Sequence, residues 1–185
     1  MEQNLRKIMS SKNNPEIEYA SQPSLHTAKD LVYDKCGLQL SQLSKEPEGL
    51  AYGACTFKLN NASVHFRVAK ITPLKTGQFV AIWKRNEKRT TIPFDSSDEI
   101  DFLIVAASNE KNSGQFIFPK LILLQQGIIT GSGKAGKRGM RVYPPWDLTN
   151  NKQAQKTQQW QATYFLPIST NSSIDIARAK LLLHL

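Results

Sequence analysis

The sequence predicts a mixed α+β domain in which helices flank a central sheet, and three observations lead to this prediction. Residues 50–71 alternate apolar and polar side chains over two segments, which is the period of a β-strand. Residues 100–107 form a nearly continuous apolar run, as in a strand buried on both faces. Helical spacing occurs before, between and after these segments, so the order of elements favours a mixed sheet covered by helices.

The amino-terminal part is predicted to be an arm followed by a helix. Residues 1–22 are polar and weakly patterned, so we expect an N-terminal arm ahead of a single domain over residues 23–185. Ser24 is a suitable N-cap, and Gly37 supplies a left-handed stop after a run with helical spacing. These two residues bound a predicted helix over 24–36.

The middle of the chain is predicted to form the sheet. Four elements are expected in this order: a polar loop over 41–49, a strand over 50–59, a central strand over 63–71 and a short helix over 76–85. Asn60 and Asn61 suit the tight turn between the two strands, because Asn tolerates positive φ. Pro73 ends the central strand because it has no N–H to donate.

The second half is predicted to complete the sheet and add helices. The expected elements are strands over 100–107 and 115–118, a helix over 121–124, an edge strand over 140–145, a helix over 150–164 and a last helix over 174–185. Gly127 is expected to stop the helix over 121–124.

The positive charge of the chain is concentrated in two blocks. The net charge is +9, yet residues 95–110 contain five acids and no Lys or Arg. The surplus lies in residues 67–89, where seven Lys and Arg face one acid, and in residues 134–156. Two separated blocks of one sign predict a surface that binds phosphates if the fold brings them together.

Several kinds of site are excluded or disfavoured by the motifs. Two cysteines and three scattered histidines offer no zinc-ligand spacing, and no Gly-x-Ser-x-Gly elbow is present. His65 could face a site or be a packed histidine, and Cys55 could be a nucleophile or a buried structural thiol. No run is apolar enough for a membrane helix and no secretory signal is evident, so we expect a cytoplasmic protein without a membrane partner or a bound cofactor.

Residues 131–139 are rich in glycine and lysine but do not match a phosphate-binding P-loop. Gly133-Lys134 is followed by Ala135 where a P-loop has Ser or Thr, and no helix pattern follows. We interpret this stretch as a flexible basic loop that contacts a nucleic-acid backbone.

Aromatic residues lie beside the basic blocks and could stack on unpaired bases. Helical spacing points Trp83 and Trp160 towards the core, which leaves Trp146 as the candidate for exposure. The predicted nucleic-acid-binding residues, for DNA or RNA, are Arg67, Lys70, Lys75, Lys84, Arg85, Lys137, Arg138, Arg141 and Trp146.

A stretch of the chain resembles the MepB family. The resemblance is carried in order by residues 52–57, 66–73, 77–80 and 83–85, and then by 116–120 and 136–147, and it covers roughly residues 25–166. The family is named after a gene beside a multidrug efflux pump, so the resemblance implies little chemistry by itself.

The order of elements also resembles the PD-(D/E)XK nuclease fold, which implies a lysine and two carboxylates that hold Mg²⁺. Lys70 stands at the position of that lysine, and Gln78 resembles a helix glutamine of some such nucleases. Val68 occupies the place of the expected acid, and Glu48 and Asp101 are the nearest carboxylates that could substitute. Three readings stay open: a nucleic-acid-binding protein with a degenerate catalytic site, a metal-dependent nuclease with a rearranged site that uses Mg²⁺, and a regulatory protein-interaction domain linked to drug resistance.

Overall fold

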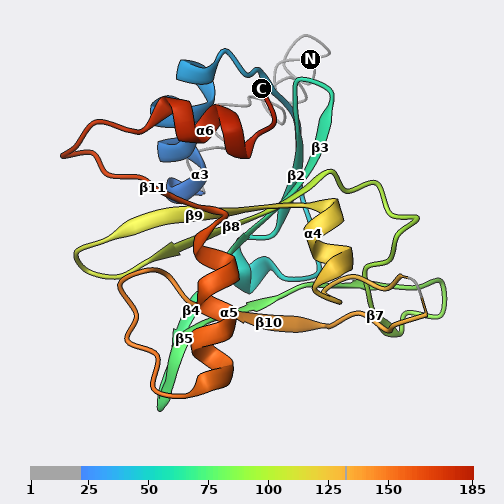
Figure 1. Cartoon of the computed structure of the whole chain (residues 1–185). Helices are drawn as coiled ribbons and strands as arrows, with labels where there is room; N and C mark the ends of the chain where they lie inside the picture. The colour runs from blue at the N-terminus through green and yellow to red at the C-terminus, as the bar shows by residue number, and fades with distance from the viewer. Residues whose placement is uncertain (1–21, 132) are drawn as a thin grey trace, which may run out of the picture.

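The computed structural model describes residues 22–131 and 133–185, and these form a mixed α+β fold with a six-stranded mixed central sheet (Figure 1). The strands of this sheet, in spatial order, are β1 (Leu40–Lys45), β2 (Cys55–Leu59), β3 (Ala62–Val68), β8 (Phe102–Ser108), β9 (Ser113–Pro119) and β11 (Phe165–Pro167). All neighbouring pairs are antiparallel except β3 and β8, which run parallel from Val64↔Phe102 to Val68↔Ala106.

A parallel pair needs a long crossover, and here the crossover builds further strands. Between β3 and β8 the chain forms β4 (Lys70–Thr72), β5 (Lys75–Ala81), β6 (Trp83–Arg85) and β7 (Thr91–Pro93). Strands β4 and β5 form a second sheet with β10 (Gly139–Val142), in the order β10-β5-β4, and β6 pairs with β7. We call the β10-β5-β4 sheet the lower sheet, because it lies below the central sheet in Figure 1.

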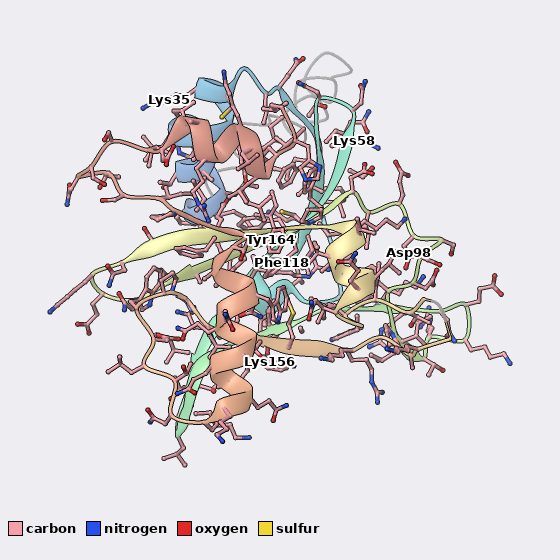
Figure 2. All side chains as sticks on the ribbon, viewed as in Figure 1. Lys35, Lys58, Asp98, Phe118, Lys156 and Tyr164 are labelled. Atoms are coloured by element: carbon pink, nitrogen blue, oxygen red, sulfur yellow. The ribbon has the colours of Figure 1, made fainter. Side chains whose placement is uncertain are left out.

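Two hydrophobic cores lie on the two faces of the central sheet. Above it pack α3 (Pro23–Ala28), which continues as the π-helical turn η2 (Lys29–Tyr33) and the 3₁₀ turn η3 (Asp34–Cys36), and α6 (Ile176–Leu182). Below it lie α4 (Lys120–Gln125), α5 (Lys152–Ala162) and the lower sheet. Phe66 and Ile104 point into the upper core, whereas Val105 and Phe118 point into the lower one. Figure 2 shows Phe118 behind α5, next to Tyr164.

The structure confirms most of the predicted elements. The four expected strands lie side by side as β2, β3, β8 and β9, and the first helix spans 23–36 and ends at left-handed Gly37. Asn60 adopts the positive φ expected of the hairpin turn, with a value of 51°. The helices near 121, 150 and 174 and the edge strand near 140 are also present; α4 is slightly longer than expected, and the other three are shorter.

The predicted helix over 76–85 is wrong, because this segment forms strands β5 and β6. Its apolar residues fit both periods, but Gly77 disfavours a helix, and pairing with β4 and β10 buries Gln78, Val80 and Ile82 on alternate positions. Trp83 therefore lies on a strand and is half-buried.

Other boundaries also differ. The expected loop over 41–49 begins with strand β1, and the expected strand over 50–59 begins with a 3₁₀ turn, η4 (Leu50–Tyr52), bounded by left-handed Gly49 and Gly53. The expected central strand stops at Val68, and Lys70 starts the lower sheet. Of the predicted arm, residues 1–21 lie outside the described residues, whereas Gln22 is buried and donates a hydrogen bond to the Gly53 carbonyl at 2.8 Å.

No helix in the described part of the chain has the length and apolarity required to cross a membrane.

Candidate functional site

The outward face of the lower sheet brings aromatic and cationic side chains together. The register places Arg141 of β10 opposite Phe79 of β5, and Phe79 opposite Lys70 of β4, so the three lie in one row. Tyr52 of η4 packs edge-on against Phe79 with ring centroids 6.1 Å apart, and Lys70 Nζ lies 5.1 Å from the Tyr52 centroid. With Tyr143, which follows β10 on the same side, these residues form a surface that we call the basic face.

Arg141 is held in place by the β4–β5 hairpin. Its Nη2 donates to Thr72 Oγ1 at 2.7 Å, and its Nη1 donates to the Gly77 carbonyl at 3.0 Å and, more weakly, to the Thr76 carbonyl at 3.5 Å. A guanidinium carries five N–H donors, so these three acceptors leave donors for an anion.

Helix α5 covers the free edge of β10 through one buried side chain. Gln161 is 1% exposed; its Oε1 accepts from the Tyr143 backbone N–H at 2.9 Å, and its Nε2 donates to the Arg141 carbonyl at 3.0 Å. An edge strand otherwise leaves such groups unpaired, so Gln161 joins α5 to the lower sheet. At the other end of the helix, the Asn151 side chain caps the N-terminus by accepting from Ala154 N at 2.8 Å.

A groove of about 380 Å³ runs between α5 and β10. We call it the α5–β10 groove; the lining residues used below are Lys137, Arg141, Asn151, Gln153, Thr157 and Trp160. Two cations, three side chains with amide or hydroxyl groups and an indole ring therefore line one concave surface. Arg141 belongs to both the groove and the basic face, so the two surfaces are continuous.

The glycine- and lysine-rich loop beside the groove presents further cations. Lys134, Lys137 and Arg138 are exposed, and the loop is tied down by hydrogen bonds from Lys137 N to the Ile128 carbonyl at 2.8 Å and from Ile82 N to the Arg138 carbonyl at 3.0 Å. On α5, Lys152 and Lys156 are exposed, and Figure 2 shows Lys156 in the lower half of the molecule. None of these five cations forms an ion pair with another described residue.

Two of the predicted binding residues are engaged in ion pairs within the fold. Arg67 is 1% exposed, pairs with Glu46 and donates to the Phe66 carbonyl at 2.8 Å. Lys84 pairs with Asp98 and, at 2.7 Å, with Asp95. Desolvation lowers the pKa of Lys84, but hydrogen bonds and charges from the two aspartates outweigh it and raise the pKa.

The remaining predicted residues differ in their access to solvent. Lys75 is exposed at the β4–β5 hairpin, and Arg85 is half-exposed, lies 5.4 Å from the Trp83 ring centroid and pairs with Glu48 at 3.3 Å. Trp146 is half-buried and packs edge-on against Phe165 with centroids 5.4 Å apart, and its Nε1 is buried. The expectation that Trp146 is the exposed tryptophan is therefore wrong.

The predicted catalytic pair does not converge. Lys70 is exposed on the basic face, whereas Gln78 is 2% exposed, points to the opposite face of the lower sheet and donates to the Ser108 carbonyl at 3.0 Å. Gln78 lies on a strand and not on a helix. Asp101 accepts from Ser63 N at 2.7 Å, at the opposite end of β3 from Val68. No cluster of three His, Cys, Asp or Glu suited to a metal ion occurs in residues 22–131 and 133–185.

Comparisons with known proteins identify the family. A family model described as MepB-like matches residues 46–167. The chain belongs to the MepB-like family. A solved structure titled "Crystal Structure of MepB" is 36% identical and superposes with a TM-score of 0.69 over 72% of this chain and 89% of that one. None of the curated proteins matches the chain.

The MepB-like region contains both the basic face and the α5–β10 groove. It begins at Glu46 and ends at Pro167, so it includes the basic face, the α5–β10 groove and the loop between them. Helices α3 and α6, which cover the upper core, lie outside it.

The MepB-like region also contains a polar cluster that sequence reasoning missed. Glu46, just after β1, lies 3.3 Å from His65 Nδ1 and pairs with Arg67, and both partners point to one face of β3. Burial raises the pKa of Glu46, but the His65 hydrogen bond and the charges of Arg67 and His65 outweigh it and hold the pKa below its usual range. The alternation His65-x-Arg67 on a strand indicated a shared face, but nothing local indicated that Glu46 would meet it.

Proposed function

We propose that this protein binds nucleic acid along the basic face and the α5–β10 groove. One observation carries the proposal: both surfaces combine cations that have no acidic partner among the described residues with aromatic and amide side chains. Lysine and arginine contact phosphates, aromatic rings stack on bases, and amides hydrogen-bond to base edges. The two basic blocks of the sequence contribute Lys70 and Arg141, which lie in one row.

The contacting residues differ in part from those expected from the sequence. We propose Lys70, Lys75, Lys137, Arg138 and Arg141 as phosphate contacts, with Lys134, Lys152 and Lys156 beside them. Tyr52, Phe79 and Tyr143 replace Trp146 as the stacking surface. Arg67 and Lys84 support the fold, because each is held by acidic partners.

The order of the central strands is consistent with a nuclease-like scaffold whose chemistry has been lost. Strands β1, β2 and β3 form an antiparallel meander and β8 joins β3 in parallel, which supports this proposal, whereas the helix expected between β3 and β8 is replaced by strands β4 to β7. Val68 stands where that resemblance expects an acid, and Lys70 and Gln78 face opposite sides of a different sheet. We therefore propose binding without cleavage.

The test is a binding titration against labelled DNA and RNA, single- and double-stranded, with and without Mg²⁺. With five or six phosphate contacts, affinity is expected to fall by about two to three decades between about 50 and 200 mM salt. Lys137→Ala/Arg138→Ala should reduce the log–log salt slope by about one to two units.

The matched control is Lys35→Ala/Lys180→Ala, which removes two exposed cations from η3 and α6 above the central sheet; Figure 2 shows Lys35 beside the upper helices. An equal change in both double variants would mean that net charge, and not this surface, governs binding. Absence of binding at low salt would favour the protein-interaction reading, and Mg²⁺-dependent cleavage would favour the nuclease.

A further inference from the structure

The β4–β5 hairpin carries at its tip the most exposed large apolar side chain in the described part of the chain. Leu74 is fully exposed to solvent, with a relative accessibility of 104%, and Ile71 on β4 is 67% exposed. Pro73 and Leu74 form a two-residue turn between the paired residues Thr72 and Lys75. In Figure 1 the hairpin projects from the bottom of the molecule, away from α6 and the C-terminus.

The turn contradicts local backbone preferences. Leu74 has a φ of 65°, and this position after a turn proline usually holds Gly or Asn, which tolerate positive φ. A leucine there is strained and receives no packing contacts in return, because its side chain is fully exposed. A residue that keeps an unfavourable backbone conformation without stabilising the fold is typical of a functional site.

The base of the hairpin is braced on the side of β10. Arg141 donates hydrogen bonds to Thr72 Oγ1 and to the Gly77 carbonyl. The Tyr143 ring packs so closely on Gly77 that a Cβ there would lie 2.6 Å from it. The tip is therefore presented by a fixed support.

Two exposed cations lie along the hairpin behind the apolar tip. Lys75 follows Leu74 directly, and Lys70 lies at the base of the hairpin, opposite Phe79 on the basic face. A polyanion bound along the basic face would therefore pass these two lysines and meet Leu74 at the end of the hairpin.

We propose that the Pro73–Leu74 tip is a wedge that enters a base step of duplex DNA bound along the basic face, while Lys75 beside the tip and Lys70 at the base of the hairpin contact phosphates. This inference rests on the proposed function. Leucine and proline are among the side chains that unstack base steps from the minor groove. A two-stranded hairpin is wider than an undistorted minor groove of about 6 Å, so only the tip side chains are expected to enter it, and unstacking of the step bends the duplex. The minor groove of A-form RNA is shallow and wide, so it offers the tip less purchase.

The experiment compares wild type with Leu74→Asn on duplex DNA that contains a central 2-aminopurine and a pair of dyes at its ends. Asparagine tolerates the turn conformation, so the variant should fold while lacking the wedge. Wild type should raise 2-aminopurine fluorescence and kink the duplex by about 20–90°. It should also bind a duplex with a central mismatch about tenfold more tightly than a matched duplex, because a mismatched step costs less to unstack.

Leu74→Asn should lose all three effects and keep the salt slope of wild type. Leu148→Asn, which replaces an 84% exposed leucine outside the hairpin, should keep all of them. Salt-dependent binding with no unstacking, or with unstacking that persists in Leu74→Asn, would overturn the wedge and leave the proposed function intact. Failure of wild type to bind any duplex at low salt would overturn the wedge, and failure to bind single strands and RNA as well would overturn both.

A lipid surface is the competing partner for the apolar Pro73–Leu74 tip, because Lys75 and Lys70 on the same hairpin could contact anionic headgroups. Vesicles of anionic and of neutral lipid therefore form a second arm of the experiment. Sedimentation of wild type with anionic vesicles, lost in Leu74→Asn and accompanied by no unstacking of DNA, would overturn the DNA wedge. No vesicle binding together with DNA unstacking supports it.

Discussion

Arg67 shows how a cation can serve the core of this protein. It is 1% exposed, and its partner Glu46 would be left uncompensated if the guanidinium were removed. Breaking a buried pair in this way costs about 3–5 kcal/mol. We therefore expect Arg67→Ala to lower the free energy of unfolding in urea by about that amount, whereas Arg89→Ala, at an exposed position, should change it by about 0.5 kcal/mol or less.

Nucleic-acid affinity gives an independent readout of the same variant. The Arg67→Ala molecules that remain folded should bind with wild-type affinity and salt slope, because Arg67 does not reach the basic face. A weaker salt slope at unchanged stability would contradict the core role.

The lowered pKa of Glu46 predicts that the free energy of unfolding decreases in acid. Its pKa is lowered in the folded state, so it contributes stability above the unfolded pKa near 4.5, and this contribution is lost as pH falls through the lower folded pKa. The free energy of unfolding should fall more steeply below about pH 4.5 in wild type than in Glu46→Gln. Parallel pH profiles for the two proteins would show that Glu46 is not linked to folding.

Residue identity alone did not separate binding cations from structural ones. Lys84 and Lys70 belong to the same basic block, but only the fold shows that Asp95 and Asp98 neutralise Lys84 while Lys70 stays exposed. These acids lie in the segment whose lack of Lys and Arg was visible in the sequence. Its contact with Lys84 is made across the β6–β7 hairpin and depends on tertiary structure.

At the level of elements, Gln161 joins α5 to the free edge of β10. Gln161→Ala leaves the Tyr143 N–H and the Arg141 carbonyl without their partners, which should cost about 1–3 kcal/mol of unfolding free energy. It should also weaken nucleic-acid binding, since the groove loses one wall. Gln159→Ala, exposed on the same helix, is the control and should be neutral in both assays.

Elements with one unambiguous period were predictable from the sequence. The apolar run of β8 and the helix ending at Gly37 were correctly predicted, because burial on both faces and a left-handed stop leave few alternatives. The predicted N-cap, Ser24, is wrong, because the helix begins at Pro23 with Gln22 at the N-cap position and no side-chain cap. Strand β5 was not, because Phe79, Val80, Ile82 and Trp83 fit either a helix or a strand until β10 supplies a partner. Strand β11 has only three residues, which is too short for a periodic signal.

At the scale of the whole molecule, the two layers below and above the central sheet are expected to respond differently to ligand. At a nucleic-acid concentration of about 100 times Kd, the free energy of unfolding should rise by about 2.7 kcal/mol. Hydrogen exchange should slow in β5, β10 and α5, while α3 and α6 remain unchanged apart from the global effect. Both changes should disappear at high salt, and uniform protection of both layers would contradict a binding surface confined to the lower one.

Pairing of β10 with β5 joins Gly139 to Ala81, and Gln161 then completes the edge. During synthesis β5 must wait for about 60 further residues before β10 can pair with it, or roughly 3–12 s at the translation rate of about 5–20 residues per second. The central pairs β2–β3 and β3–β8 become available earlier. A nascent chain therefore exposes Lys70 and Lys75 of its β4–β5 hairpin beside the polyanionic ribosome before β10, the strand that orients the hairpin, has been made.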